Sequence, residues 1–268
     1  MSPSEVALHW RKKFMQATES VAPSDLFVPQ TVACFPALPS RKEAPADLLH
    51  ALRRKGEAVI RGTWTVFGNR EIQVDDPPNW SYDYLSKVNV STPQAGSRLN
   101  HRQLPGKADV KLVWELSRWH ELTRLAQAGW LLEERCFAEK TLDWLESWVT
   151  SNPPGIGWNW TSALESGLRL IQFTWIDALI TAGIDFPQKS ERLNCLRHAL
   201  LGPHARFTWR YRSFGSSANN HLIGELAGLI IACVRWPGLD RYAVPLQTLA
   251  KLWEGEVLAQ FELDGGNR

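Results

Sequence analysis

The 268-residue sequence predicts an all-α fold of antiparallel helical hairpins, preceded by a small irregular and β-containing lead-in. Two observations support this prediction. Beyond residue 109, apolar residues recur at helical spacing, and short breaks such as Asn152–Gly155 and Pro237–Gly238 divide the run into segments. Short connections between helices favour antiparallel neighbours. The expected helices cover 110–130, 134–150, 160–182, 189–212, 218–235 and 239–262.

The first 108 residues predict a mixed lead-in that packs on the helical domain of residues 109–268. Helical patterns occur at Val6–Gln16 and Pro45–Lys55. Residues 57–76 alternate and contain β-formers, which indicates a strand or hairpin, and 77–108 are loop-like. Within the helical domain, Gly202–Pro203 is expected to act as a further break.

Composition excludes several function classes. The chain has 30 Lys and Arg against 28 Asp and Glu, with 44% apolar and 22% charged residues, which is typical of a folded globular protein. A net charge of +2 provides no strong positive field, so nucleic acid is not an expected partner. The four cysteines form no C-x-x-C pair, and neither a metal site nor a cofactor is predicted.

The sequence also contains no membrane or export pattern. The N-terminus lacks an apolar signal-peptide core. The longest apolar run, Leu226–Val234, is far shorter than the roughly 20 residues of a membrane-spanning helix. We therefore expect no membrane partner and a cytoplasmic location by default, or a periplasmic one if a leader has been removed.

A helix in such an array normally turns apolar residues toward the core and polar residues toward solvent. Three of the expected helices carry a more specific stripe of polar residues. In the first, Lys111, Trp114, Glu115 and Arg118 share one face, and we predict that they contact a substrate. The alternative is an ordinary solvated face with a Glu115–Arg118 surface pair.

The second helix follows a loop rich in Trp, Gly and Pro. Glu165 and Arg169 lie on its polar face with Ser162 and Gln172, and the opposite face is apolar; that face consists of Leu164, Leu168, Ile171 and Trp175. In the loop, Trp158, Asn159 and Trp160 are predicted to contact a sugar, because aromatic rings on a polar rim suit the apolar faces of sugar rings. The alternative is that each Trp packs in the core.

The third helix is apolar almost all round, so we expect it to be central and buried. Its polar groups are Asn219, Asn220, His221 and Glu225. Buried polar groups need partners, which a ligand in a cleft would provide. Simple capping of the helix start is the alternative.

Together these segments resemble the heparinase II/III family of polysaccharide lyases, in its N-terminal (α/α) toroid domain. The resemblance lies in Asp109–Arg118 (DVKLVWELSR), Asn152–Glu165 (NPPGIGWNWTSALE) and Ser217–Glu225 (SANNHLIGE), with weaker similarity at Gly62–Gly68. It implies an incomplete (α/α) toroid, and an acidic, uronate-containing polysaccharide as the partner.

The resemblance also implies a chemistry. The family cleaves uronic-acid polysaccharides by β-elimination, in which the proton on C5 is removed only after the adjacent carboxylate has been neutralised by hydrogen-bond donors. A Tyr or His then takes the proton, and an acid protonates the leaving oxygen. By this match Asn220 neutralises the carboxylate and His221 is its neighbour in the site. Asn219 is the other residue that fits the position.

One part of the family pattern is missing from this sequence. The family's catalytic Tyr follows an acidic-Gly-Gly segment, and Asp264–Gly266 resembles the start of that segment. The tyrosines of this chain lie elsewhere, at 82, 84, 211 and 242. The β-sandwich that follows in the family, with its catalytic His, is likewise not among these residues. We therefore expect a truncated toroid without the base and acid, inactive alone, and the sequence predicts neither a particular polysaccharide nor an oligomeric state.

Two other functions fit the same residues. The first is a non-catalytic carbohydrate-binding domain or degenerate lyase remnant. The second is an inverting glycoside hydrolase, which would need two carboxylates roughly 6.5–9.5 Å apart. Glu115, Glu165 and Glu225 are the candidates, but an Arg shares the helix face of the first two and would lower their pKa.

Overall fold

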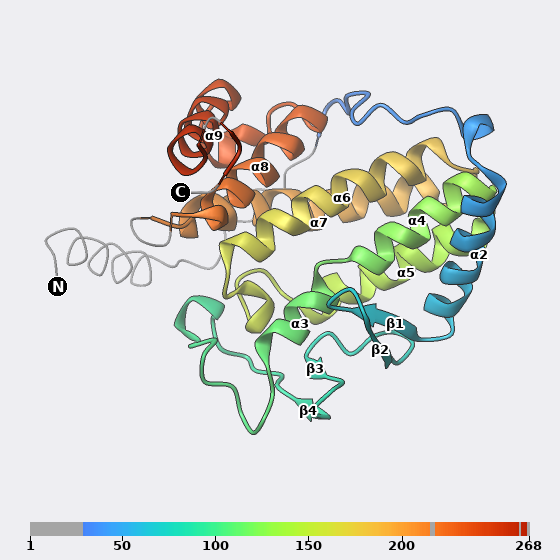
Figure 1. Ribbon diagram of the computed structural model, residues 1–268, viewed down its shortest axis with the longest axis horizontal. Helices are drawn as coiled ribbons and strands as arrows, with labels where there is room; N and C mark the ends of the chain where they lie inside the picture. Colours follow the sequence, from blue (N-terminus) through green and yellow to red (C-terminus); the bar gives the residue numbers. More distant parts are fainter. Residues whose placement is uncertain (1–28, 215–217, 263, 267–268) are drawn as a thin grey trace, which may run out of the picture.

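A computed structural model describes residues 29–214, 218–262 and 264–266, and these residues form an all-α, toroid-like array with two small antiparallel sheets (Figure 1). The array consists of helical hairpins in which each helix packs on the next. Helices α4, α6 and α8 also pack side by side as a row. The hairpins are α4 (His120–Leu132) with α5 (Arg135–Ser151), α6 (Ala163–Ala182) with α7 (Lys189–Tyr211), and α8 (Asn220–Arg235) with α9 (Leu246–Gln260).

The helices α5 to α8 confirm the predicted segments to within a few residues, and three predictions were wrong in detail. The expected helix over 110–130 is divided into α3 (Val110–Ser117) and α4, because Trp119 takes a left-handed conformation with φ 65°. Helix α7 continues through Gly202–Pro203, where its neighbouring residues are buried against the core. Between 239 and 262, a 3₁₀ turn (η5, Leu239–Tyr242) precedes α9. The helix expected at Val6–Gln16 lies outside the described residues.

The lead-in forms short elements that pack on α3, α4 and α5. Helix α2 extends past the predicted Lys55 and takes in residues that were expected to be strand. The predicted hairpin is confirmed as β1 paired with β2, with Trp64 opposite Ile72. The elements of the lead-in are η1 (Arg41–Glu43), α2 (Ala46–Ile60), β1 (Thr63–Val66), β2 (Arg70–Gln73), β3 (Tyr82–Asp83), β4 (Val88–Asn89) and η2 (Gly96–Arg98). A further 3₁₀ turn, η3 (Trp158–Trp160), lies between α5 and α6.

Tryptophan dominates the core. The largest fully buried side chains include the indoles of Trp64, Trp80, Trp119, Trp144, Trp148, Trp160 and Trp236. The ring of Trp64 lies 6.1 Å from Trp80 and 5.4 Å from Trp144, so the lead-in and α5 share one aromatic cluster. Large rings bury much apolar area, and a buried indole N–H usually finds an acceptor. Trp80 donates to Ser147 Oγ, and Trp148 donates to Ser117 Oγ.

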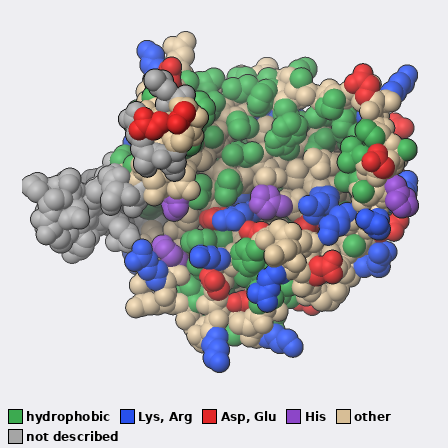
Figure 2. All heavy atoms as spheres, viewed as in Figure 1, with side chains coloured by type: hydrophobic (Ala, Val, Ile, Leu, Met, Phe, Trp, Pro, Cys, Tyr) green, Lys and Arg blue, Asp and Glu red, His purple; other side chains and the backbone are tan. Residues whose placement is uncertain are grey.

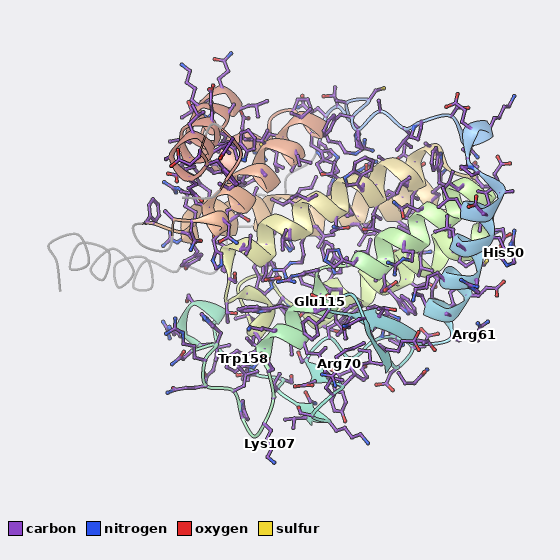
Figure 3. All side chains as sticks on the ribbon, in the orientation of Figure 1. His50, Arg61, Arg70, Lys107, Glu115 and Trp158 are labelled. Carbon is purple, nitrogen blue, oxygen red and sulfur yellow. The ribbon has the colours of Figure 1, made fainter. Side chains whose placement is uncertain are left out.

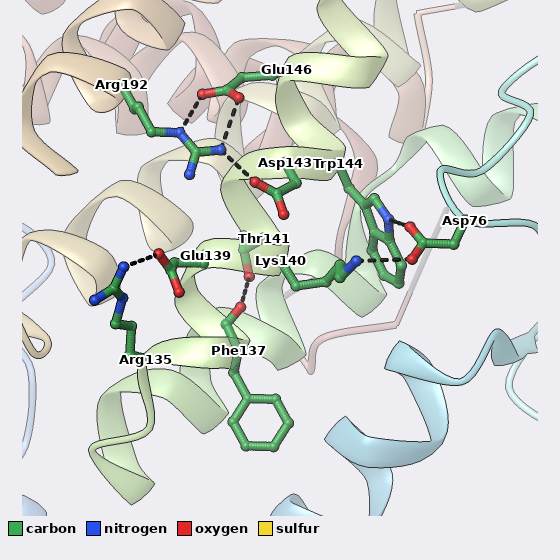
Figure 4. A network of polar contacts seen from close by, with 10 residues as sticks. All are labelled: Asp76, Arg135, Phe137, Glu139, Lys140, Thr141, Asp143, Trp144, Glu146 and Arg192. Carbon is green, nitrogen blue, oxygen red and sulfur yellow. Dashed lines mark hydrogen bonds and ion pairs between the residues drawn. The ribbon is translucent and has the colours of Figure 1, made fainter. Parts of the chain in front are cut away.

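Polar side chains on α5 tie the lead-in and α7 to the array (Figure 4). On one side, Lys140 Nζ and Trp144 Nε1 both donate to the carboxylate of Asp76, at 2.9 and 2.7 Å. On the other side, Arg192 of α7 binds Glu146 through two hydrogen bonds and also reaches Asp143. Helix α5 is therefore held from both neighbours by charge-assisted bonds, which are stronger than neutral ones.

The polar face of helix α6 is buried, and part of its apolar face is exposed, which differs from the expectation. Its polar residues Glu165 and Arg169 are 1% and 0% exposed, whereas Trp175 of the apolar stripe is 38% exposed. The reason is its position, because α4, α7 and α8 all pack on it and enclose the polar face.

Figure 2 shows hydrophobic side chains gathered on the surface over α6 and α8, above a band of charged side chains. No helix of the described residues is long and apolar enough to span a membrane.

Helices α6 and α8 approach each other at glycine. A Cβ added to Gly228 would lie 2.3 Å from the carbonyl oxygen of Gly167, and one added to Gly167 would lie 3.1 Å from the Cα of Glu225. No side chain fits at the 2.3 Å distance, and the 3.1 Å distance is tighter than most Cβ contacts, so these two glycines allow the close spacing of the two helices.

We expect Gly228→Ala to destabilise the protein by about 2 kcal/mol, because the helices must separate to admit the methyl group. Gly255→Ala is the matched control. Gly255 is also inside a helix, but nothing lies within 4 Å of its Cβ position, so the same substitution should stabilise α9 by about 0.5–1 kcal/mol. Urea unfolding of the two variants measures both signs, and equal effects would contradict this account of the contact.

Candidate functional site

The three sequence segments that predicted a site meet around the N-terminal half of α6. Arg118, at the end of α3, binds Glu165 in the first turn of α6. Two residues later, Gly167 lies against Glu225 of α8. The loop before α6 joins the same group, because Trp114 Nε1 donates to the carbonyl oxygen of Trp158 at 3.0 Å. Figure 3 labels Glu115, which belongs to α3, and Trp158 of this loop.

Arg118 is clamped between two carboxylates. Its Nε and Nη2 donate to the two oxygens of Glu165 at 2.8 and 2.7 Å, and its Nη1 donates to Glu115 at 2.8 Å. These bonds, to Glu165 above all, raise the pKa of the Arg118 guanidinium. The other oxygen of Glu115 accepts the backbone N–H of Phe67 at 3.0 Å. One cation therefore faces two anions, and an incoming anion would have to compete for it.

Arg169 lies in an aromatic cage inside the protein. Its Cζ is 5.1 Å from the ring of Trp148 and 5.7 Å from that of Trp160, a geometry suited to cation–π attraction. Its Nε donates to His204 Nε2 at 2.9 Å, and its Nη2 donates to the carbonyl oxygen of Asn159 at 2.6 Å. Burial lowers the pKa of Arg169 to about 9, so the group remains charged at neutral pH.

The loop before α6 is interior. Trp158 and Trp160 are 6% and 1% exposed, so the structure places both rings where the core-packing alternative would have them. Trp158 Nε1 donates to the carbonyl oxygen of Val90, and Asn159 Nδ2 donates to that of Trp80. The loop thus joins the lead-in to α6 and lies beneath the exposed residues of the candidate site.

Helix α8 was expected to be central and buried, but its N-terminus is exposed. Asn219 caps the helix by accepting the backbone N–H of His221 at 3.1 Å. The side chains of Asn220 and His221 lie on the surface. Glu225 is buried instead, and both its oxygens accept bonds from Ser213, from the backbone N–H and from Oγ. Burial raises the pKa of the Glu225 carboxyl.

The predicted residues therefore divide into a buried set and a surface set. The enclosed residues are Trp158, Asn159, Trp160, Glu165, Arg169 and Glu225. Those that reach solvent are Lys111, Trp114, Glu115, Arg118, Asn219, Asn220 and His221. Within the described part of the chain, no group of three His, Cys, Asp or Glu side chains is placed to hold a metal ion.

Sequence reasoning missed two residues of this region. Phe67 is 45% exposed, lies in a tight turn with φ 52°, and donates its backbone N–H to Glu115. Only its place in the Gly62–Gly68 stretch could have indicated it. His204 is fully buried against Arg169, and nothing in the sequence around Gly202–Pro203 pointed to such a contact.

Comparisons with known proteins show a match in fold. No protein-family model and no curated protein matches the sequence. Among solved structures, the heparan sulfate lyase HepC from Pedobacter heparinus is similar over 98% of this chain, with a TM-score of 0.58 and 14% identity. A heparinase III, the BT4657 gene product, is similar over 97%, with a TM-score of 0.57 and 16% identity. This chain spans 36% and 39% of those two chains, so the likeness covers little more than a third of each.

The contacts of His204 predict that the fold is sensitive to acid. Its Nδ1 bonds the carbonyl oxygen of Leu200 at 2.8 Å, and its Nε2 accepts from Arg169, an arrangement that the neutral ring satisfies and the protonated ring does not. Burial, together with the charge of Arg169, lowers the pKa of His204 well below 6.5.

Because this pKa is lower in the folded state, the stabilising effect of neutral His204 is present above about pH 6.5 and is lost as pH falls. We expect the free energy of unfolding to fall as the pH drops below about 6.5, with a slope that steepens toward a limit of about 1.4 kcal/mol per pH unit, before most carboxylates titrate. Urea titrations at several pH values measure this slope. His204→Gln should reduce it, and His50→Gln, at an exposed position on α2, should not.

Proposed function

We propose that this chain is the polysaccharide-binding toroid domain of a lyase-like protein, and that its ligand is an acidic, uronate-containing polysaccharide. The observation that carries the proposal is the meeting of α3, the Trp-rich loop and the start of α8 around one end of α6. These are the stretches that resemble heparinase II/III, and the fold is similar to heparan sulfate lyases.

In this proposal the exposed residues contact the ligand and the buried residues hold them in place. Asn220 offers a side-chain amide at the N-terminus of α8, where the helix dipole also favours an anion. His221 is the next residue on the surface. The half-buried Trp114 and the exposed Phe67 provide aromatic surface on the α3 side.

The proposed chemistry is the neutralisation of a uronate carboxylate. An amide N–H aimed at this group stabilises the charge that develops when the C5 proton leaves. Turnover also requires a base and an acid, and we assign these to no described residue. Tyr84, for example, binds Asp75 through its hydroxyl, and its pKa is raised to about 12, chiefly by burial. Binding without turnover is therefore the activity we propose for these residues alone.

The hydrolase alternative has less support. An inverting hydrolase needs a protonated carboxyl group and a carboxylate separated by a water molecule. Both oxygens of Glu165 accept bonds from Arg118, and both oxygens of Glu225 accept bonds from Ser213. These carboxylates hold protein groups together and are not free to contact a sugar.

We expect Asn220→Ala to weaken the binding of uronate oligosaccharides by about 10-fold, because a hydrogen bond to a charged group contributes about 1.5 kcal/mol. The side chain is exposed, so stability should change by less than about 0.5 kcal/mol. Isothermal calorimetry with an acidic oligosaccharide and with its carboxyl-reduced form makes the comparison. The reduced form should bind weakly to both proteins.

Gln247→Ala on α9 is the matched control, since it removes an exposed amide from another part of the surface. Equal binding by the parent protein and Asn220→Ala would contradict the assignment of Asn220. Formation of an unsaturated uronate, detected by its ultraviolet absorbance, would show that these residues do contain a base.

A further inference from the structure

The basic side chains of this protein are unevenly distributed. Residues 87–111 carry five Lys and Arg against a single acid, Asp109. Because the whole chain has 30 basic and 28 acidic residues, the remainder carries two more acids than bases. The near-neutral total thus hides a strongly basic segment, which we call the basic segment; its cations are Lys87, Arg98, Arg102, Lys107 and Lys111.

All five cations are exposed, and within the described ranges none of them takes part in an ion pair. Outside the segment, some exposed cations pair with acids, as Arg135 does with Glu139 and Arg53 with Glu134, and others, such as Lys42 and Arg54, have no described ion pair. The one acid of the segment is engaged, because Asp109 caps α3 by accepting the N–H of Lys111 at 2.9 Å. The positive charge of the segment is therefore not balanced within the segment itself.

The basic segment is also held in a fixed shape. Leu99, Leu104 and Ala108, which alternate with the cations along the chain, pack on a small core formed by Val90, Val110, Val113 and Trp158. Gly106, in the turn before Lys107, has φ 65°, and its Cβ position lies 3.7 Å from Val88, so the turn rests against β4. Figure 3 shows Lys107 at the outer end of this segment.

The same segment is attached to the Trp-rich loop of the proposed site. Gly96 N–H donates to the carbonyl oxygen of Gly155 at 2.8 Å, and Gly157 N–H donates to that of Gln94 at 2.9 Å. A Cβ on Gly96 would lie 2.2 Å from the carbonyl oxygen of Trp160, so the two segments are in direct contact. His101 lies over Trp114, with ring centroids 5.5 Å apart. The cations therefore lie at the edge of the surface that carries Trp114.

We infer that the basic segment binds a run of anionic groups along the ligand, so that the protein takes a polysaccharide charged on several consecutive sugars and not one with a single acidic residue. This inference rests on the proposed function and extends it. Spaced cations on an anchored loop attract a repeating anion and release its counterions, so the binding is steeply dependent on salt. Arg118, on the α3 side of the site, adds little such attraction, because it is already held by Glu115 and Glu165.

The test is a triple substitution, Arg98→Gln, Arg102→Gln and Lys107→Gln, compared with a triple of equal charge change at exposed positions that have no described ion pair: Lys42→Gln, Arg54→Gln and Lys251→Gln. The control positions belong to η1, α2 and α9, which lie away from the basic segment in Figure 1. Binding of heparin oligosaccharides is measured by calorimetry at several salt concentrations. Circular dichroism and thermal melting establish that both variants are folded.

We expect the loop triple to bind heparin oligosaccharides at least tenfold more weakly at low salt, with a shallower dependence on salt, and the control triple to change affinity less than twofold. An equal loss in both triples, or none in the loop triple, would overturn the inference. If Asn220→Ala alone weakens binding, the proposed function stands and this inference fails. If no acidic polysaccharide binds, both fail, and binding of DNA of equal charge as tightly as heparin would overturn the choice of a polysaccharide.

Discussion

The structure depends on the burial of a polar helix face. Helix α6 is enclosed by α4, α7 and α8, and the face it turns inward carries Glu165 and Arg169. A buried charge destabilises a protein strongly unless it is paired or hydrogen-bonded. Arg118 compensates Glu165, and the Trp148 and Trp160 rings, His204 and a backbone carbonyl surround Arg169. The positions of α3, α5, α7 and the Trp-rich loop are all constrained by these contacts.

The same contacts also hold the Trp-rich loop in place beneath the proposed site. The carbonyl oxygen of Asn159 is bound by Arg169, and that of Trp158 by Trp114, so the loop is fixed from both sides. The groups that remain exposed, Asn220 and His221, stand at the start of a helix whose position Gly167 and Gly228 determine. Binding surfaces built on fixed helices lose less entropy when a ligand is bound. The buried polar residues thus contribute to binding by holding the exposed ones in place.

Hydrophobic periodicity and turn residues predicted most of the fold. They located α5, α6, α7 and α8, and the alternation of residues 57–76 predicted the β1–β2 hairpin. The break at Trp119 was not predictable, since a left-handed tryptophan follows from tertiary packing and leaves no sequence pattern. The same holds for the continuation of α7 past Pro203, where the surrounding burial outweighs a local preference. Local propensity is a weak guide wherever packing decides the backbone.

The residues of the proposed site were found in the right segments, but their burial was not predicted. Spacing along a helix shows which side chains share a face, and it does not show which neighbour that face meets. On α6 the polar stripe meets the aromatic core, so residues that were expected to touch a ligand instead support the residues at the surface. Phe67, from the distant β1–β2 hairpin, lies at the surface beside Glu115. The charge pattern of residues 87–111 has the opposite character: it is plain in the sequence, but it gains meaning only when the backbone contacts of Gly96 and Gly157 attach that segment to the Trp-rich loop. A local excess of charge that the whole-chain average conceals can therefore contribute to a binding surface once the fold places it beside the other residues of the site.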